Sequence, residues 1–292
     1  MLRPCFIQPN SLIGWIPPKT LYEVPVIPKS SAPDITSGDN ISGNNTIGNT
    51  KTNVPRHLAI IMDGNNRWAK QHGLEGNLGH KKGAKAVRDT VENCAQAGVE
   101  VLTVYAFSSE NWRRPENEVN ALMEIFLESL TAEVPMLHEN NIRLRFIGDI
   151  SAFSSVLREK MQQSMEDTKS NSRMTFAVAV NYGGHWDIAN AARILAEKVE
   201  AGELKASEVT PELMQQHISL GDLPPPDLCI RTSNEQRISN FMLWQMAYTE
   251  FYFPEILWPD FDNDALQEAF REYGSRQRRF GRTSEQIEEA EG

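Results

Sequence analysis

The sequence predicts an α/β fold built on a parallel sheet. From His57 onward, strand-like and helix-like segments alternate with short connections, which is typical of strands joined by crossover helices. The first apolar run, from Leu58 to Met62, is unbroken, as in a strand that is covered on both faces. With 292 residues, 40% of them hydrophobic, the chain can bury the core of one large domain or two small ones.

The individual elements follow from length, periodicity and helix-ending residues. A helix with apolar positions at Ala84, Val87, Val91 and Cys94 is expected to end at Gly98. Pro115 opens a long helix. We expect strands at 58–62, 99–107, 142–147, 174–180, 227–230 and 250–253, and further helices at 154–168, 186–200 and 262–280, with a polar helical hairpin before the fifth strand.

Composition excludes several classes of protein. A formal charge of -10 argues against a nucleic-acid binder, because phosphate backbones require a concentrated basic surface. Cys5, Cys94 and Cys229 lie far apart, so the sequence suggests neither a zinc site nor a disulfide framework, and a reducing compartment fits best. No apolar run approaches the roughly 18 residues of a membrane span, and polar residues and prolines interrupt any signal-peptide core. We therefore expect a cytoplasmic protein.

The two ends of the chain differ from the middle. Fourteen of the eighteen residues from Thr36 to Asn53 are Ser, Thr, Asn or Gly, a composition that buries too little to offset its ordering entropy. We expect residues 1–54 to form a disordered extension, although an incorrectly assigned start codon gives the same appearance. We expect residues 55–283 to form the folded domain and residues 284–292 a flexible tail.

The first strand leads into a group of polar residues suited to phosphate and metal. Asp63 is expected at the carboxyl end of the strand, where open α/β sheets bind ligands. Gly64 allows close approach of an anion, and Arg67 supplies a forked donor for phosphate oxygens. In this interpretation Asp63 holds a cation. The alternative is a tight turn that merely follows a strand.

Other polar residues flank the remaining strands, and we expect them to converge with Asp63 on one edge of the sheet. The residues just past the strands are Ser108 to Asn111, Asp149, Asn181 and Arg231, and Glu250 begins the last strand. Glu250 stands among aromatic residues, and a metal shared with Asp63 would relieve the cost of burying its carboxylate.

Each of these segments also has a structural interpretation. Ser108 to Trp112 can be a helix cap with Trp112 as a lid, or a diphosphate contact through Asn111 and Arg114. Arg231 and Arg237 can form surface salt bridges, or a second anion pocket with Ser239. His80 fits a helix start, which is also where phosphate binds.

Two longer sequence patterns also have two interpretations each. An apolar stripe runs along the helix from Val119 to Leu137, and it suits either a core or the wall of an apolar tunnel. The basic run Arg276, Arg278, Arg279 and Arg282 suits a solvated helix face or a subunit contact.

Several motifs, in order over residues 55–283, together resemble the cis-prenyltransferases, the family of the bacterial undecaprenyl diphosphate synthases. They are Asp63-Gly-Asn-Asn-Arg-Trp-Ala-Lys, Gly79-His-Lys, Phe107-Ser-Ser-Glu-Asn-Trp, Asn181-Tyr-Gly-Gly, Arg231-Thr, Arg237-Ile-Ser-Asn-Phe and Trp258-Pro-Asp-Phe. The resemblance implies a six-stranded, largely parallel sheet with surrounding helices, a hydrophobic tunnel over the sheet, and a homodimer.

The resemblance also implies roles for individual residues. Asp63 is the magnesium-binding acid, and Glu250 a second metal-linked acid reached from the partner subunit or through water. Asn111 matches a loop residue that positions the homoallylic substrate, and our hypothesis is that the proton lost in catalysis goes to a phosphate oxygen or to a relay around Asp63 and Asn111. The implied substrate-binding residues are Gly64, Asn65, Asn66, Arg67, Trp68 and His80 for the allylic diphosphate, Ser108, Ser109, Glu110, Trp112 and Arg114 in a positioning loop, and Arg231, Arg237 and Ser239 for isopentenyl diphosphate. Implied tunnel residues are Leu122, Ile125, Phe126, Leu144 and Met174.

The sequence departs from the family pattern at a few positions. The family commonly has glycine in place of Asn66 and arginine in place of Gly76. It tends to have Arg-Thr-Gly-Gly-Glu where this chain has Arg231-Thr-Ser-Asn-Glu235, and often histidine at Gln236.

The reaction that the resemblance implies is sequential cis condensation of isopentenyl diphosphate onto farnesyl diphosphate with Mg²⁺. Its product is a long polyprenyl diphosphate such as undecaprenyl diphosphate, the lipid carrier precursor for cell-wall polysaccharide synthesis, and peripheral membrane association would aid its release. Three alternatives are a non-catalytic scaffold subunit, a phosphatase, and a trans-prenyl elongating enzyme. The last needs aspartate-rich helices, and no adjacent aspartate pair occurs in this chain.

Overall fold

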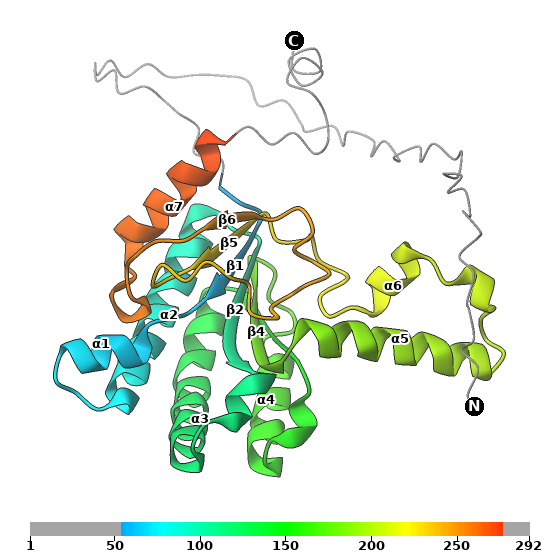
Figure 1. Cartoon of the computed structure of the whole chain (residues 1–292), viewed down its shortest axis with the longest axis horizontal. Coiled ribbons are helices and arrows are strands. Elements are labelled where there is room, and N and C mark those ends of the chain that lie inside the picture. The colour runs from blue at the N-terminus through cyan, green and yellow to red at the C-terminus, as the bar shows by residue number, and fades with distance from the viewer. Residues whose placement is uncertain (1–53, 277–292) are drawn as a thin grey trace, which may run out of the picture. The chain divides into compact units, whose positions relative to one another are not determined.

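The computed structural model describes residues 54–276, in which six parallel strands form one sheet (Figure 1). The strand order is β3-β4-β2-β1-β5-β6. The strands are β1 (His57–Ile61), β2 (Val101–Ser108), β3 (Ile142–Ile147), β4 (Met174–Tyr182), β5 (Leu228–Arg231) and β6 (Glu250–Tyr252). The predicted α/β class and all six predicted strands are therefore confirmed, with ends that shift by one or two residues.

The helices also follow the predicted pattern. They are α1 (Asn65–Gln71), α2 (Gly76–Ala97), α3 (Glu116–Glu139), α4 (Ser155–Asp167), α5 (Gly184–Glu200), α6 (Pro211–His217) and α7 (Asn263–Ser275). Gly98 ends α2 in the left-handed conformation, φ +88°, which glycine adopts without steric cost. Pro115 caps α3 as expected. The predicted end of the last helix at 280, and the predictions for residues 1–53 and 277–292, lie outside the described residues.

The two faces of the sheet are covered differently. Helices α2, α3, α4 and α7 pack on one face, against strand residues such as Leu58, Ile60 and Leu102. The other face carries Ala59 and Ala179 and is covered by residues from α5 and from the segments around Leu220 and Phe241, of which Leu220, Phe241, Met242 and Met246 are buried. Because strand side chains alternate between the faces, the same strands supply both cores.

None of the helices in the described part of the chain is both long and apolar enough to cross a membrane. Cys94 and Cys229 are buried free thiols. Burial raises the pKa of Cys229 to about 12, so this thiol is protonated and unreactive at neutral pH.

Candidate active site

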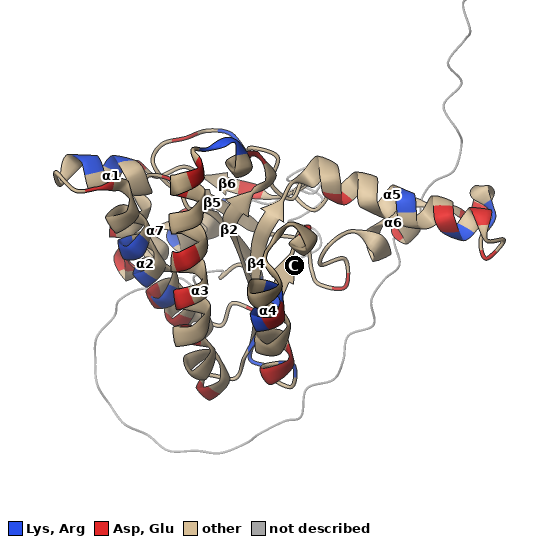
Figure 2. Ribbon diagram, turned by 90° about the horizontal axis from the view of Figure 1, so that it is seen from below, with Lys and Arg blue, Asp and Glu red and all other residues tan. Residues whose placement is uncertain are grey.

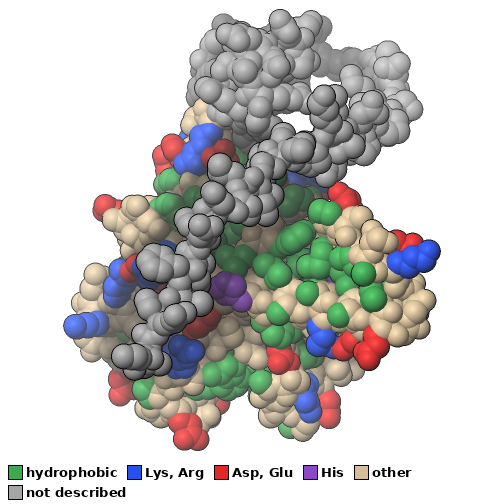
Figure 3. Space-filling model, turned by 45° about the vertical axis from the view of Figure 1, so that its right-hand side comes forward, with side chains coloured by type: hydrophobic (Ala, Val, Ile, Leu, Met, Phe, Trp, Pro, Cys, Tyr) green, Lys and Arg blue, Asp and Glu red, His purple; other side chains and the backbone are tan. Residues whose placement is uncertain are grey.

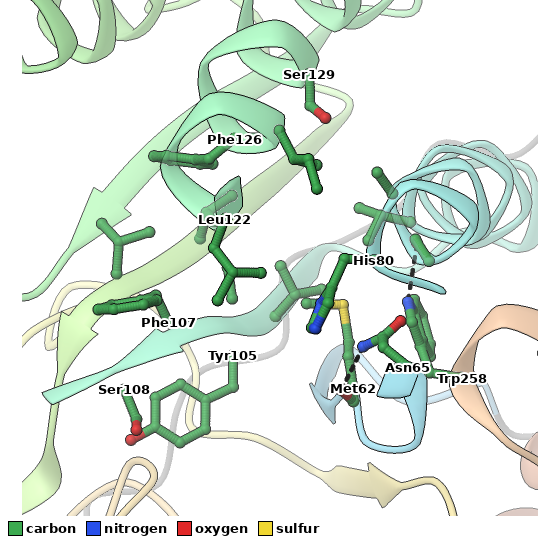
Figure 4. Close-up of a pocket in the computed structure, with 18 of the residues that line it drawn as sticks. Met62, Asn65, His80, Tyr105, Phe107, Ser108, Leu122, Phe126, Ser129 and Trp258 are labelled. Carbon is green, nitrogen blue, oxygen red and sulfur yellow. Dashed lines mark hydrogen bonds between the residues drawn. The ribbon is translucent and has the colours of Figure 1, made fainter. Parts of the chain in front are cut away.

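A cavity of about 840 Å³ lies over the sheet on the side of α2 and α3. Its polar end is formed at the carboxyl ends of β1, β2 and β5, where Asp63, Ser108 and Arg231 stand. Its walls are mainly apolar and include Leu122 and Phe126 from α3 (Figure 4). An open parallel sheet places its ligand site at this edge, so the position of the cavity agrees with the topology.

Asp63 and Arg231 form the centre of the polar end. β1 and β5 are adjacent, with Ile61 in register with Arg231, so Asp63 emerges next to the end of β5. Nη2 of Arg231 donates to Oδ2 of Asp63 at 2.8 Å. Thr232 Oγ1 accepts from the Asp63 amide at 2.9 Å and lies 2.7 Å from the Asp63 carbonyl, which fixes the backbone at the acid. The two predicted site residues therefore meet because their strands are neighbours.

Arg231 is a buried cation, with only 5% of its side chain exposed. Its other bonds go to Ser239 Oγ at 2.7 Å and to the carbonyl of Arg237. Its Nε is buried and has no hydrogen-bond partner among the described residues. A buried guanidinium donor without an acceptor is costly, and an anion bound in the cavity would satisfy it.

Glu235 joins two of the predicted anion-binding arginines, Arg67 and Arg237, a role that sequence analysis missed. Arg67 Nη2 lies 3.1 Å from Oε1 of Glu235, and Arg237 pairs with Oε2 of the same carboxylate. Arg67 also lies 3.7 Å from Asp63. Glu235 is part of a motif that the sequence displays, but only the fold shows that one carboxylate lies between arginines from two segments. It orients both cations while leaving them half-exposed to a ligand.

His80 points into the cavity from the first turns of α2 (Figure 4). Burial, and then the charge of Arg114, lower the pKa of His80 to about 4. Its Nε2 is buried without a hydrogen-bond partner in the described part of the chain. The imidazole is neutral at pH 7, so it can donate one hydrogen bond to a phosphate oxygen without adding charge.

The loop after β2 is a helix cap, as the structural interpretation of the sequence predicts. Oδ1 of Asn111 accepts from the Ser108 amide at 2.9 Å, and the Ser108 side chain completes the capping box. Both residues still line the cavity, as does Arg114, which pairs with Glu118 at 2.9 Å. Capping therefore orders the loop that faces the site.

The position of Glu250 contradicts the expectation that it lies beside Asp63. It begins β6, in register with Leu228 at the start of β5, whereas Asp63 follows the end of β1. All strands run in one direction, so Glu250 lies where the strands begin and Asp63 lies where they end. The two carboxylates are therefore on opposite sides of the sheet along the strand direction and cannot share a metal within one chain. Glu250 pairs instead with Arg276 at 3.0 Å. In a parallel sheet the ligand site lies at the carboxyl ends of the strands, so a residue at the start of a strand lies far from it.

Three predicted substrate-binding residues do not line the cavity: Trp68, Ser109 and Trp112. Trp68 donates from Nε1 to Asp260 at 2.7 Å and stacks on His72. Trp112 packs edge-on against Phe107 and donates to Oδ1 of Asn181 at 2.8 Å. Buried indole N–H groups usually donate a hydrogen bond to a protein acceptor. Here these two bonds hold Trp68 and Trp112 against other parts of the fold and not in the cavity lining.

The other predicted substrate-binding residues line the cavity: Gly64, Asn65, Asn66, Arg67, His80, Ser108, Glu110, Arg114, Arg231, Arg237 and Ser239. The cavity brings together the residues predicted for the two diphosphates. Asn240, which the sequence analysis did not assign, also lines it and donates to Glu110 at 2.9 Å.

The apolar part of the cavity contains most of the predicted tunnel residues. Leu122, Ile125, Phe126 and Leu144 line it, whereas Met174 lies in the closed core, 2% exposed. The wall also contains one unexpected ion pair, with Oε2 of Glu133 3.6 Å from Nε of Arg88. Burial raises the pKa of Glu133. The long apolar cavity suits a hydrocarbon more than a soluble metabolite.

Magnesium fits the polar end on the chemistry of the donors. The described residues contain no group of three or more His, Cys, Asp or Glu that could hold a metal alone. Mg²⁺ is commonly bound by one or two carboxylates together with substrate phosphates and water, and Asp63 is such a carboxylate, one-third exposed at the cavity. The site therefore fits a metal that arrives with a diphosphate.

Comparison with known proteins decides the family. The family described as "Putative undecaprenyl diphosphate synthase" matches residues 61–281. The chain belongs to the cis-prenyltransferase family. It is 56% identical over 237 residues to a ditrans,polycis-undecaprenyl-diphosphate synthase of Pseudomonas syringae that is named as specific for (2E,6E)-farnesyl diphosphate, covering 81% of this chain and 94% of the relative. The synthase of the same name from Vibrio cholerae is 52% identical over 234 residues, covering 80% and 94%.

Solved structures of cis-prenyltransferases have the same fold. Lavandulyl diphosphate synthase from Lavandula x intermedia, in complex with dimethylallyl diphosphate, superposes with a TM-score of 0.76 at 38% identity, covering 78% of this chain and 98% of that one. A probable undecaprenyl diphosphate synthase from Campylobacter jejuni gives 0.67 at 33% identity, covering 79% and 100%. This chain is thus a prenyltransferase.

Proposed function

We propose that this cis-prenyltransferase condenses isopentenyl diphosphate repeatedly onto farnesyl diphosphate to give undecaprenyl diphosphate, a lipid carrier precursor for cell-wall polysaccharide synthesis. One observation carries the proposal: a cavity of about 840 Å³ joins an arginine-rich polar end to an apolar channel. The names of the relatives from Pseudomonas and Vibrio support the choice of starter and product.

The proposed polar end binds two diphosphates in different ways. Arg67, the amide of Gly64 and neutral His80 surround the allylic diphosphate, whose negative charge grows as its C–O bond breaks. Arg231, Arg237 and Ser239 hold isopentenyl diphosphate, with the unpaired Nε of Arg231 as a further donor. Bound Mg²⁺, held by Asp63, would supply neutralising charge for the diphosphates.

The chain's residues then orient the reacting carbons and exclude water. The double bond of isopentenyl diphosphate attacks the allylic carbon, diphosphate leaves, and a proton is lost beside the new bond. We assign that proton to a diphosphate oxygen or to a relay around Asp63 and Asn111, which both line the cavity. The lengthened chain lies along Leu122 and Phe126, where burial stabilises it by about 0.8 kcal/mol per CH₂.

The test mixes purified protein, Mg²⁺, farnesyl diphosphate and labelled isopentenyl diphosphate, and sizes the extracted lipid. We expect a long polyprenyl product, and a loss of activity of at least about 10³-fold in Asp63→Asn, because the isosteric amide removes the charge that holds the cation. Asp149→Asn is the matched control: it removes a carboxylate just after β3, a strand that β4 and β2 separate from β1, and Asp149 lies outside this cavity.

Two rival functions are separated by the same assay. A scaffold subunit gives no elongated lipid without a catalytic partner, and a phosphatase gives farnesol without chain growth. Full activity in Asp63→Asn would contradict the proposed role of the acid.

We further propose a homodimer that works in the cytoplasm, in which each Glu250 serves the site of the other subunit. The support is that Asp63 and Glu250 lie at opposite edges of one sheet, so only a second copy brings them together. Hydrophobic side chains gather on one face of the molecule (Figure 3), and Tyr248, two residues before Glu250, is 82% exposed. Mixing inactive Asp63→Asn and Glu250→Gln subunits should restore about a quarter of wild-type activity, because half the dimers then hold one intact site. No recovery after confirmed subunit exchange would contradict the sharing.

A further inference from the structure

The region around α1 and the start of α2 is basic, although the whole protein is acidic. Residues 65–88 contain six basic side chains and one acidic one, against a formal charge of -10 for the chain. Figure 2 shows the Lys and Arg positions on α1 and along α2. The basic residues are Arg67, Lys70, Lys81, Lys82, Lys85 and Arg88, and the acidic one is Glu75. A local excess of this size attracts anions.

Most of this charge is not neutralised by the protein. Lys70, Lys82 and Lys85 are exposed and form no ion pair within residues 54–276. Lys81 has only a distant partner, Glu128, with 4.0 Å between Nζ and the carboxylate. Arg67 and Arg88, by contrast, are committed to acidic partners near the cavity. The lysines are therefore available to a ligand.

Two of the free lysines, Lys82 and Lys85, share one face of α2 with an exposed leucine, and the third, Lys70, lies in α1. Leu78, Lys82 and Lys85 recur at intervals of four and three residues, so they lie on one side of the helix. The cavity is lined by Gly83, Ala84 and Val87, on other sides of the helix. The lysine face is consequently separate from the diphosphate site.

Two leucines complete the surface. Leu74, in the connection between α1 and α2, is 43% exposed, and Leu78 is 42% exposed. They are two of the six large hydrophobic side chains that are exposed in the described part of the chain. Water-exposed leucine beside unpaired lysine matches the composition of surfaces that lie at a bilayer, with apolar groups below the headgroups and cations among them.

We propose that Lys70, Leu74, Leu78, Lys82 and Lys85 form a docking surface for an anionic lipid bilayer. The five side chains, here called the α1–α2 surface, supply the three free cations and the two apolar contacts described above. A bilayer is favoured over an acidic protein because leucines accompany the charges, and over nucleic acid because the protein is otherwise acidic. The choice of a lipid partner rests on the proposed function, whose product is a membrane lipid.

Vesicle co-sedimentation tests the proposal with the full-length protein. We expect binding to vesicles of phosphatidylcholine with phosphatidylglycerol, weak binding to phosphatidylcholine alone, and release as salt rises, since screening shortens the range of the field. Lys82→Gln with Lys85→Gln should weaken partitioning about 25-fold, at about fivefold per lysine. Leu74→Ser with Leu78→Ser should weaken it about tenfold or more.

The matched control is Lys198→Gln with Lys205→Gln, which removes the same charge near the far end of α5. α1 and α5 lie at opposite ends of the described domain in Figures 1 and 2, so this control should bind vesicles like wild type. Equal losses in both lysine pairs would mean that net charge alone drives binding, and would overturn the proposed surface. Unchanged binding in the α1–α2 variants would overturn it as well.

A second readout separates this proposal from the proposed function. Prenyl transfer in detergent solution should be unchanged by Lys82→Gln with Lys85→Gln, because neither residue lines the cavity. Wild-type protein that binds vesicles but makes no polyprenyl lipid would contradict the proposed function and leave the docking surface standing. Protein that makes polyprenyl lipid but does not bind anionic vesicles would contradict the docking surface and support the proposed function.

Discussion

The two faces of the one sheet are packed for different purposes. On the face toward α5, the strands carry small side chains such as Ala59, Ala177 and Ala179, and large aromatic side chains fill the space above them. On the face toward α2 and α3, the strands carry larger side chains such as Val104 and Leu144, yet a cavity remains above them. Side-chain size on the strands thus does not determine which face is hollow.

The filled face is closed by aromatic contacts and a buried polar network. Phe241, fully buried, stacks on Tyr105 with 4.3 Å between ring centroids. Asp187, 1% exposed, accepts from the Tyr182 hydroxyl at 2.8 Å, the Gln245 amide at 3.0 Å and the amide and hydroxyl of Ser219. A buried carboxylate with this many donors is satisfied without a ligand. This face stabilises the fold.

The cavity face is held open by its helices. α2 and α3 enclose the cavity, and they are linked by Lys81 with Glu128 and by Arg88 with Glu133. Unpaired polar atoms, such as Nε of Arg231 and Nε2 of His80, occur on this side at the polar end. These two donors therefore lie where the cavity is open and a ligand is proposed to bind, although the filled face also contains one buried atom without a partner among the described residues, Oε1 of Gln245.

Truncating one phenylalanine on each face of the sheet tests whether the two faces are packed differently. Phe241→Ala removes a fully buried ring from the filled face and should lower the free energy of unfolding by about 3–5 kcal/mol. Phe126→Ala removes a ring that already borders the cavity, so it should cost about 1 kcal/mol and shift the lengths of the lipid products. Urea unfolding of both variants measures the difference. Equal losses would show that the cavity wall is packed like the core.

The buried His57 and the partly buried His80 allow the two faces to be compared by their response to pH. On the filled face, both ring nitrogens of His57 have partners, Pro224 O and Thr103 Oγ1, each at 2.7 Å. Burial lowers the pKa values of both His57 and His80 to about 4, from 6.5. The unfolded chain therefore binds more protons than the folded chain between these values. Stability is complete above pH 6.5 and falls as the pH drops toward 4.

Chemical denaturation at neutral pH and near pH 5 measures the effect. His57 should account for a loss of about 2 kcal/mol over this interval, and partly exposed His80 for less. His80→Gln should remove only its own share of the pH dependence. A diphosphate ligand should raise the pKa of His80 and leave that of His57 unchanged, which two-dimensional NMR of the imidazoles can follow. Identical responses of the two histidines would contradict a ligand site at His80.

The sequence predicted the parts of this arrangement that depend on local pattern. Unbroken apolar runs identify the six strands, and a polar residue after a strand identifies Asp63 and Arg231. The expectation for Glu250 was wrong because convergence was inferred from strand ends without separating the start of a strand from its end. The partners of Trp68 and the role of Glu235 depend on tertiary contacts between distant segments, which no local pattern encodes.

The cavity itself was predicted only through the resemblance. The apolar stripe on α3 suited a core as well as a tunnel, since both require the same side chains. Only the fold shows that α2 and α3 enclose an open volume of about 840 Å³, because that volume depends on tertiary packing that a helix stripe does not encode.

The smallest predicted effect concerns two departures from the family pattern, at Asn66 and Gly76, at the edge of the cavity face. A Cβ placed on Gly76 would lie 2.7 Å from Oδ1 of Asn66, so the asparagine occupies the space that a side chain at 76 needs. Asn66 also lies 3.4 Å from Glu118, which pairs with Arg114. The two departures are therefore linked sterically rather than independent.

A double-mutant cycle tests this link. Gly76→Arg alone should destabilise the protein by about 1 kcal/mol, because Asn66 must move away. Asn66→Gly alone should cost only about 0.3 kcal/mol, because asparagine is itself a weak helix former and glycine is only slightly worse in α1. The double variant should be no less stable than Asn66→Gly, which gives a coupling energy of about 1 kcal/mol in urea unfolding. Gly76→Ala is the control with a single added carbon, and its loss should also disappear in the Asn66→Gly background. Strictly additive losses would mean that Asn66 swings aside freely, and that each substitution acts on its own.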